Sequence, residues 1–132
     1  MLIEAAIGIS VFLCLLIIGM DLMRLAYINY AGRYVAEQSA RAAAAGDHTL
    51  SPDARVPSIK QNIIAIARAF SLAFTADNIQ ICAGTAPGCL TESAGGPEQE
   101  FTIQIRYPQS VLGLSASQFT FRFEATAKNE RY

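Results

Sequence analysis

The amino-acid sequence predicts an α+β fold, in which a long N-terminal helix carries a small head of one helix on a three-stranded antiparallel sheet. Residues 1–20 are apolar apart from one charged side chain, whereas the rest of the chain carries charges of both signs. Beyond the first helix, apolar residues recur first with helical spacing and then at every second position. We therefore expect a long helix over residues 1–46 and a head domain over residues 47–132.

The first twenty residues form the apolar run MLIEAAIGISVFLCLLIIGM, whose one charged residue is Glu4. A helix of this length measures about 30 Å, which is the thickness of a bilayer's hydrocarbon core. A secretory signal peptide would have a basic segment before its apolar stretch, but no basic residue precedes Arg24. We expect residues 1–20 to lie in a membrane, or in a lipid-like core formed by copies of the chain.

The helix is expected to continue beyond this run as far as residue 45. No proline occurs between Asp21 and Ala45, and good helix formers prevail there. Gly46 follows a run of alanines, which is typical of the residue just after a helix C terminus. Three tyrosines follow the apolar run: Tyr27, Tyr30 and Tyr34. They fit either a membrane–water boundary or packing between this helix and the head.

A second helix is expected to begin at Pro57, because proline suits the first helical position. Apolar residues then recur at spacings of three and four and form one stripe: Ile59, Ile63, Ile66, Phe70 and Phe74. This helix is expected to end near Thr75 or Ala76. The polar, glycine-rich segment from Leu90 to Gln99 is expected to be exposed and mobile.

Three segments alternate between apolar and polar residues and are predicted to be strands: 78–82, 100–107 and 118–127. Their inward residues are expected to be Ile79 and Ile81, then Phe101, Ile103, Ile105 and Tyr107, and finally Phe119, Phe121, Phe123 and Ala125. A sheet with one apolar face must pack against an amphipathic helix.

Cys82 and Cys89 flank a short segment rich in glycine, proline and small residues. Two cysteines across such a turn can reach the roughly 5.5 Å Cα separation of a disulfide. The alternative, a metal site, lacks the further ligands that four-coordinate zinc needs. We expect a Cys82–Cys89 disulfide and therefore an oxidising compartment outside the cytoplasm. Cys14 lies in the apolar run and is expected to behave as a small hydrophobic residue.

The orientation of the chain raises a conflict. The first basic residues, Arg24 and Arg33, follow the apolar run, and the positive-inside rule would then place the head in the cytoplasm. The expected disulfide places it outside. Both observations agree if a basic leader once preceded Met1 and has been removed, so we expect a processed N terminus.

Composition argues against several classes of function. The net charge of −1 and the lack of a basic cluster argue against contacts with nucleic acid. His48 is the single histidine, and it is adjacent to Asp47. An isolated pair of neighbouring His and Asp residues is more often solvated surface than an acid–base device. We expect no catalysis, no metal and no cofactor.

The opening MLIEAAIGISVFLCLLIIG resembles the mature N terminus of type IV pilins and pseudopilins, an apolar helix with one early glutamate. The stretch GRYVAEQSARAAAAG and the ending FRFEATAKNERY resemble the TadE-like proteins of the tight-adherence (Tad) branch. Together the resembling segments cover about half of the chain. In this family the glutamate is usually the fifth mature residue, whereas here it is the fourth. The family's common helix-breaking proline is absent, so a more continuous helix is expected.

The resemblance implies a structural subunit of an extracellular filament. A prepilin peptidase would remove a basic leader, and an inner-membrane assembly platform would extract the subunit from the inner membrane into a homo-oligomeric helical filament on a bacterial or archaeal surface. Glu4 would neutralise the N-terminal amine of a neighbouring subunit. Packing in the filament core would use Ile7, Val11, Phe12, Leu15 and Ile18. The alternatives are a minor pseudopilin of a Tad or type II secretion system, and a single-pass membrane protein with a small extracytoplasmic binding domain.

Overall fold

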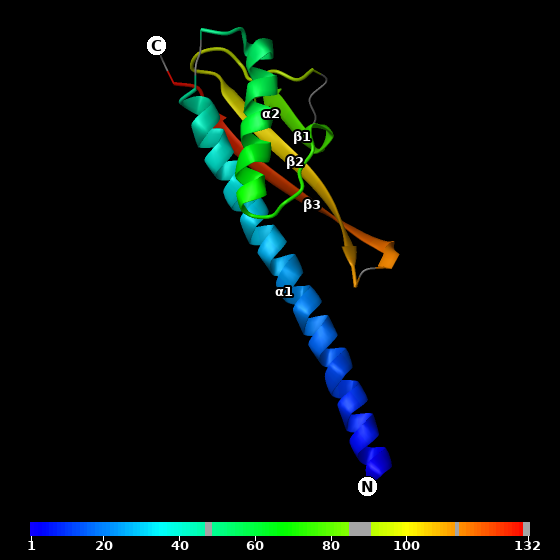
Figure 1. Cartoon of the computed structure of the whole chain (residues 1–132). Coiled ribbons are helices and arrows are strands. Elements are labelled where there is room, and N and C mark those ends of the chain that lie inside the picture. Colours follow the sequence, from blue (N-terminus) through cyan, green and yellow to red (C-terminus); the bar gives the residue numbers. More distant parts are fainter. Residues whose placement is uncertain (47–48, 85–90, 113, 131–132) are drawn as a thin grey trace.

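The computed structural model describes residues 1–46, 49–84, 91–112 and 114–130. In these residues the chain forms α1 (Leu2–Ala44), α2 (Pro52–Ala69), the short 3₁₀ helix η1 (Ala76–Asn78), and the strands β1 (Ile79–Ala83), β2 (Glu100–Val111) and β3 (Leu114–Lys128). The strands form one antiparallel sheet in the order β1-β2-β3. The C-terminal half of α1 and all of α2 cover one face of it, and the other half of α1 projects away (Figure 1). The predicted α+β class is confirmed.

Helix α1 is continuous, as its sequence without proline predicts. Its C-terminal half is buried on one side at positions three or four residues apart: Ile28, Ala31, Gly32, Val35, Ala36, Ser39, Ala40, Ala43 and Ala44. Most of these residues are small, so the helix axis lies close to the sheet. Gly46 follows the C-cap residue Ala45, and its N–H donates to the carbonyl of Ala43 over 3.3 Å without a left-handed φ.

Helix α1 lies very close to the sheet at Gly32. A Cβ atom at this position would overlap the ring of Phe123, which is itself buried. Phe123 stacks on Phe121, with ring centroids 5.8 Å apart, and therefore has little room to move aside. The absence of a side chain at Gly32 sets the distance between the two layers.

Helix α2 begins five residues earlier than predicted, at Pro52 instead of Pro57. The Ser51 hydroxyl accepts a hydrogen bond from the N–H of Ala54 (3.3 Å), and Pro52 occupies the first helical position. Pro57 lies on the exposed side inside the helix, where it lacks the N–H that would bond the Asp53 carbonyl. The serine cap therefore decided the start of the helix, and the prediction had assigned that role to the wrong proline.

The helix also ends earlier than predicted, at Ala69. Ser71 has a left-handed φ of 58°. Its N–H donates to the carbonyl of Arg68, and the N–H of Leu72 donates to that of Ala67, both over 3.0 Å. This is the hydrogen-bond pattern of a Schellman motif, usually built on glycine. Phe74 is consequently outside the helix, although it remains buried against Tyr107 and Phe123.

The inward faces of the strands are as predicted at eight positions, all of them buried: Ile79, Ile81, Phe101, Ile103, Ile105, Phe121, Phe123 and Ala125. Thr102 and Gln104, on the opposite face of the central strand β2, are buried too. One expectation was wrong. Phe119 is 53% exposed because the β2–β3 hairpin extends beyond the end of α2, so that no second helix covers it there (Figure 1).

The segment 91–99 is less exposed than predicted; Leu90 lies outside the described residues. Ala94 and Gly95 are buried. The side-chain amide of Asn129 donates to the carbonyls of Ala94 (2.9 Å), Gly95 (3.2 Å) and Gly96 (2.9 Å). The amide thus holds three consecutive carbonyls, and an ion pair of 2.7 Å between Lys60 and Glu92 adds a link to α2. The predicted exposure is confirmed at five of the nine described positions, and Ala94 and Gly95 are buried where Asn129 binds their carbonyls.

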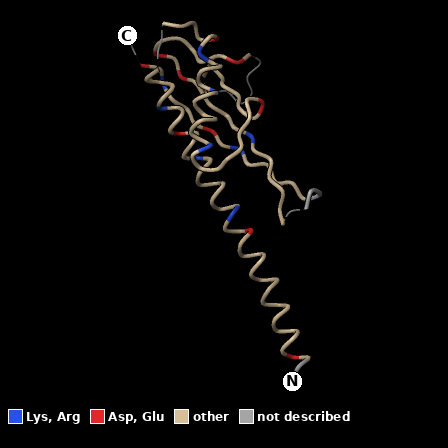
Figure 2. Tube along the Cα trace, viewed as in Figure 1, with Lys and Arg blue, Asp and Glu red and all other residues tan. Residues whose placement is uncertain are grey.

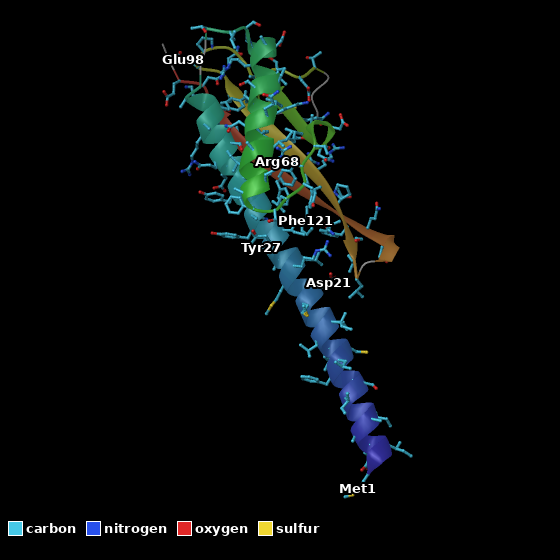
Figure 3. The ribbon with its side chains drawn as sticks, in the orientation of Figure 1. Met1, Asp21, Tyr27, Arg68, Glu98 and Phe121 are labelled. Atoms are coloured by element: carbon cyan, nitrogen blue, oxygen red, sulfur yellow. The ribbon has the colours of Figure 1, made fainter. Side chains whose placement is uncertain are left out.

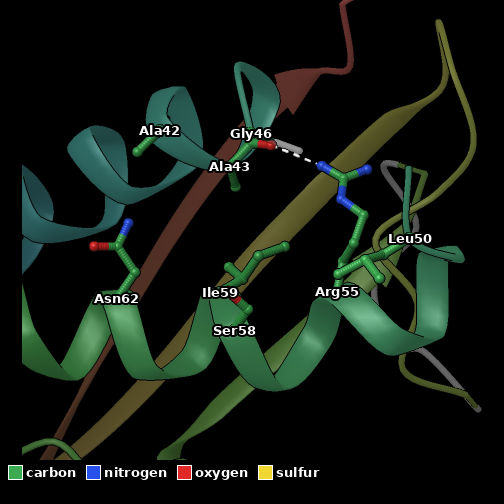
Figure 4. Close-up of a pocket in the computed structure, with 8 residues that line it drawn as sticks. All are labelled: Ala42, Ala43, Gly46, Leu50, Arg55, Ser58, Ile59 and Asn62. Atoms are coloured by element: carbon green, nitrogen blue, oxygen red, sulfur yellow. Dashed lines mark hydrogen bonds between the residues drawn. The ribbon is translucent and has the colours of Figure 1, made fainter. Parts of the chain in front are cut away.

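The ends of α1 and α2 meet at a small pocket, where Arg55 is buried. Its guanidinium donates to the carbonyl of Ala43 over 2.8 Å (Figure 4). A cation at a helix C terminus satisfies a carbonyl that has no partner inside the helix and interacts favourably with the helix dipole. This contact helps to hold the two helices together at the end of the head farthest from the N terminus.

Cys82 is buried at the end of β1 and is disulfide-bonded. Cys89 lies outside the described residues, so the pairing of Cys82 with Cys89 stays a prediction. We expect Cys89→Ala to lower the free energy of unfolding by about 2.5 kcal/mol, the loop-closure entropy of so short a loop. Chemical denaturation with and without reductant measures this. Reductant should destabilise the wild-type chain and the control Cys14→Ser equally and leave Cys89→Ala unchanged. A wild-type protein insensitive to reductant would contradict the pairing.

Candidate functional site

The N-terminal half of α1 is the candidate site. Its large apolar side chains are exposed on all sides of the helix: Ile3, Ile7, Ile9, Val11, Phe12, Leu13, Leu15, Leu16, Ile17, Ile18, Met20, Leu22 and Met23. In Figure 2 the trace between Glu4 and Asp21 carries no charge. A helix that is apolar around its whole circumference is stable only when lipid or other protein covers it.

This half of α1 is long and apolar enough to cross a membrane near the N terminus. None of its apolar window is buried by the described part of the chain, which sets it apart from the core helix of a soluble protein. From Ala5 onward its backbone N–H groups donate within the helix, and the Ser10 hydroxyl donates to the Ala6 carbonyl over 2.9 Å. These polar groups therefore need no water, as a lipid environment requires.

Glu4 lies in the first turn of α1 and is exposed. The side chains of Ile7, Val11, Leu15 and Ile18 follow it at spacings of three and four, so they share one side of the helix, and Phe12 borders that side. A carboxylate in the first turn interacts favourably with the helix dipole. The predicted assembly residues thus form one surface, with the charge at one end of an apolar stripe.

A shallow apolar groove runs beside this stripe. It is centred on Gly19 and lined by Phe12, Leu15, Leu16, Gly19, Met20 and Met23. A Cβ atom at Gly19 would meet nothing within 4 Å. This glycine therefore contributes a notch to the helix surface and no contact to the fold. Cys14 is a free, exposed thiol on the same half of the helix.

The transition from the apolar half to the head occurs at Asp21. Its carboxylate accepts a hydrogen bond from the backbone N–H of Leu112 in the β2–β3 hairpin (2.9 Å) and lies 4.0 Å from the guanidinium of Arg24. Figure 3 shows Asp21 at the level of the hairpin end. Sequence reasoning missed this contact. The one available signal was a carboxylate placed directly after the apolar run.

Two of the three tyrosines beyond the apolar run pack between this helix and the head, which was one of their two expected roles. The Tyr27 hydroxyl donates to the Phe70 carbonyl over 3.2 Å, and the Tyr34 ring makes an edge contact with the Phe70 ring at 5.3 Å. These two tyrosines pack on the end of α2. Tyr30 points outward and is 73% exposed.

Other candidate chemistry is sparse in the part of the chain that the structure describes. Asp47 and His48 lie outside it. Within it, no three histidine, cysteine or acidic side chains gather as metal ligands would. Arg122 and Glu124 form an ion pair along β3 at 2.6 Å, with both side chains half exposed.

Comparisons of this chain with protein-family models, curated proteins and solved structures find no match. The class of protein therefore rests on the fold and on the site. The chain is an α+β protein whose N-terminal helix is suited to anchor it in a membrane.

Proposed function

We propose that this chain is a structural subunit of an extracellular filament of the type IV pilin kind, most like the TadE-like branch. Before assembly the subunit is anchored in the inner membrane by the N-terminal half of α1. It polymerises through the apolar surface of this same half. The observation that carries the proposal is Glu4 at one end of an otherwise apolar, uncovered stripe.

A membrane anchor alone accounts for the apolar side chains but not for the carboxylate. A charge near the hydrocarbon core costs a few kcal/mol unless it is paired. In a bundle of such helices the N-terminal amine of a neighbouring subunit is a suitable partner, and the pair would then be desolvated together. The continuous helix supports the proposal further, because it joins the stripe to the head without a break.

The test replaces Glu4 by Gln, which keeps the size of the side chain and removes its charge. Breaking a buried ion pair by removing one partner costs about 3–5 kcal/mol, so we expect filaments to be lost while membrane insertion is retained. Glu37→Gln, an exposed carboxylate on the head half of the same helix, is the matched control and should assemble normally. The readout is the amount of chain sheared from the cell surface relative to the membrane pellet.

Intact-mass spectrometry of the sheared material adds a second readout. A major subunit should dominate it, with a processed N terminus and a mass lower by two protons for the disulfide. If Glu4→Gln assembles as well as the wild type, the proposed role of the carboxylate is wrong.

The second candidate is a membrane-anchored extracytoplasmic binding domain, favoured by the match between the apolar run and the thickness of a bilayer. It predicts that the wild-type chain stays in the membrane pellet, and that Glu4→Gln inserts at least as well. A minor pseudopilin would not be a major component of the sheared material. It would still need Glu4 in order to assemble with its partner subunits.

A further inference from the structure

We infer that the tip of the β2–β3 hairpin, residues 109–112, is a second membrane contact, in which the Leu112 side chain inserts into the surface of the phospholipid bilayer. The inference rests on the membrane-anchored state of α1, which both candidate functions share. It does not depend on polymerisation.

The first argument is the position of the hairpin. The hydrogen bond from the Leu112 N–H to the Asp21 carboxylate places the tip beside the residue at which the apolar run ends. The twenty residues before Asp21 extend over about 30 Å, the thickness of the hydrocarbon core. When this run spans a bilayer, Asp21 and the hairpin tip both lie at the boundary between the acyl chains and the headgroups.

The second argument is composition. The sequence carries no Asp, Glu, Lys or Arg from Tyr107 to Phe121, so the part of the hairpin that projects past α2 is uncharged. The uncharged stretch begins just past Arg106 and Arg122, which are paired across the two strands. A charge would have to be removed from water on entering the interface, whereas this hairpin has none to remove. The arginines lie farther from the tip and can remain in water.

The third argument is the conformation of Leu112. Its φ is 53°, in the left-handed region where glycine and asparagine are common and leucine is not. The side chain is 48% exposed, so burial in the head does not account for this unfavourable conformation. Transfer of the leucine into lipid would remove apolar surface from water and offset the cost.

The test uses tryptophan fluorescence, because the chain contains no tryptophan. Three single-tryptophan variants of the full chain are placed in phospholipid vesicles: Leu112→Trp, Leu50→Trp and Leu15→Trp. Leu50 is the matched control, since it is 50% exposed and lies at the opposite end of the head. Leu15 reports insertion of α1. The vesicles are prepared with and without phospholipid brominated near the headgroup end of its acyl chains.

We expect the tryptophan at 112 to emit at shorter wavelength than the one at 50, and to lose intensity with brominated lipid. The tryptophan at 50 should behave as in water. A water-like, unquenched signal at 112, with quenching at 15, overturns the inference and leaves the anchoring of α1 intact. A blue shift at 112 that brominated lipid does not quench, and that depends on protein concentration, overturns it in favour of contact with a second copy. Absence of quenching at 15 overturns both the anchor and the inference.

A second variant separates this contact from any effect of tryptophan on folding. Asparagine tolerates the left-handed conformation, so Leu112→Asn should leave the thermal unfolding of the head in detergent unchanged. In vesicles the same variant should lose the protection of the hairpin against proteolysis. Equal protection of Leu112→Asn and wild type would contradict the inference.

Discussion

Replacement of Gly32 by Val is expected to unfold much of the head. The added side chain would enter the space that the Phe123 ring occupies. Overpacking of this kind costs roughly 3 kcal/mol, which for a head this small is a fall in melting temperature on the order of 15 °C. Thermal unfolding of the full chain in detergent micelles, followed by circular dichroism, measures the change.

The chain offers matched controls for this substitution. Gly8 and Gly19 lie on the same helix, and a Cβ atom at either would meet nothing within 4 Å. Gly8→Val and Gly19→Val should therefore leave the head's unfolding unchanged. A side chain at position 32 would compete with the Phe123 ring for the same space. Phe123→Leu should therefore lower stability less in the Gly32→Val background than in the wild type. A Gly32→Val variant as stable as the wild type would show that the two layers do not meet as closely as described.

The double substitution Val11→Arg with Leu15→Arg is expected to release the chain from membranes. Both residues lie on the exposed apolar side of α1, one helical turn apart and near the middle of the apolar run. On insertion scales each arginine near the helix centre costs about 3 kcal/mol relative to an aliphatic residue, so the pair costs about 6 kcal/mol. Flotation of the full chain with phospholipid vesicles measures the bound fraction.

The control for this pair is Gln38→Arg with Ala42→Arg, which repeats the spacing on the exposed side of the head half of α1. It adds the same charge and should float with the vesicles as the wild type does. Loss of flotation in both double variants would trace the effect to net charge. Normal flotation of Val11→Arg with Leu15→Arg would contradict membrane anchoring by α1, and with it both candidate functions.

Much of the fold follows from local patterns. The absence of proline and the run of good helix formers were sufficient for a helix over residues 2–45, and the observed helix ends at Ala44. The alternation of apolar and polar residues was sufficient to predict the inward faces of the strands, because the side-chain period of a strand is two. The ends of α2 were predicted less well. They depended on the hydrogen bond of the Ser51 hydroxyl and on a left-handed Ser71, and neither residue type is reserved for these roles.

The candidate site could be predicted for a related reason. Its surface is one uninterrupted segment of helix, so spacing alone places Glu4 and the apolar side chains on one side. The link between Asp21 and the N–H of Leu112 joins residues that are 91 positions apart in sequence. The three carbonyls held by Asn129 lie at least 33 positions away from it. No local pattern marks either contact, since each arises only when the hairpin and the helix have been brought together.

The sequence by itself determined that this protein has an apolar helix with one early carboxylate, an amphipathic continuation of that helix, and strands with one apolar face. Hydrophobic periodicity and the length of the apolar run carry this information, and both are local quantities. The tertiary structure alone decided that Gly32 admits the Phe123 ring, that the β2–β3 hairpin extends past α2, and that its tip is held beside Asp21. These features depend on the distance and angle between the layers, which the packing of distant side chains sets.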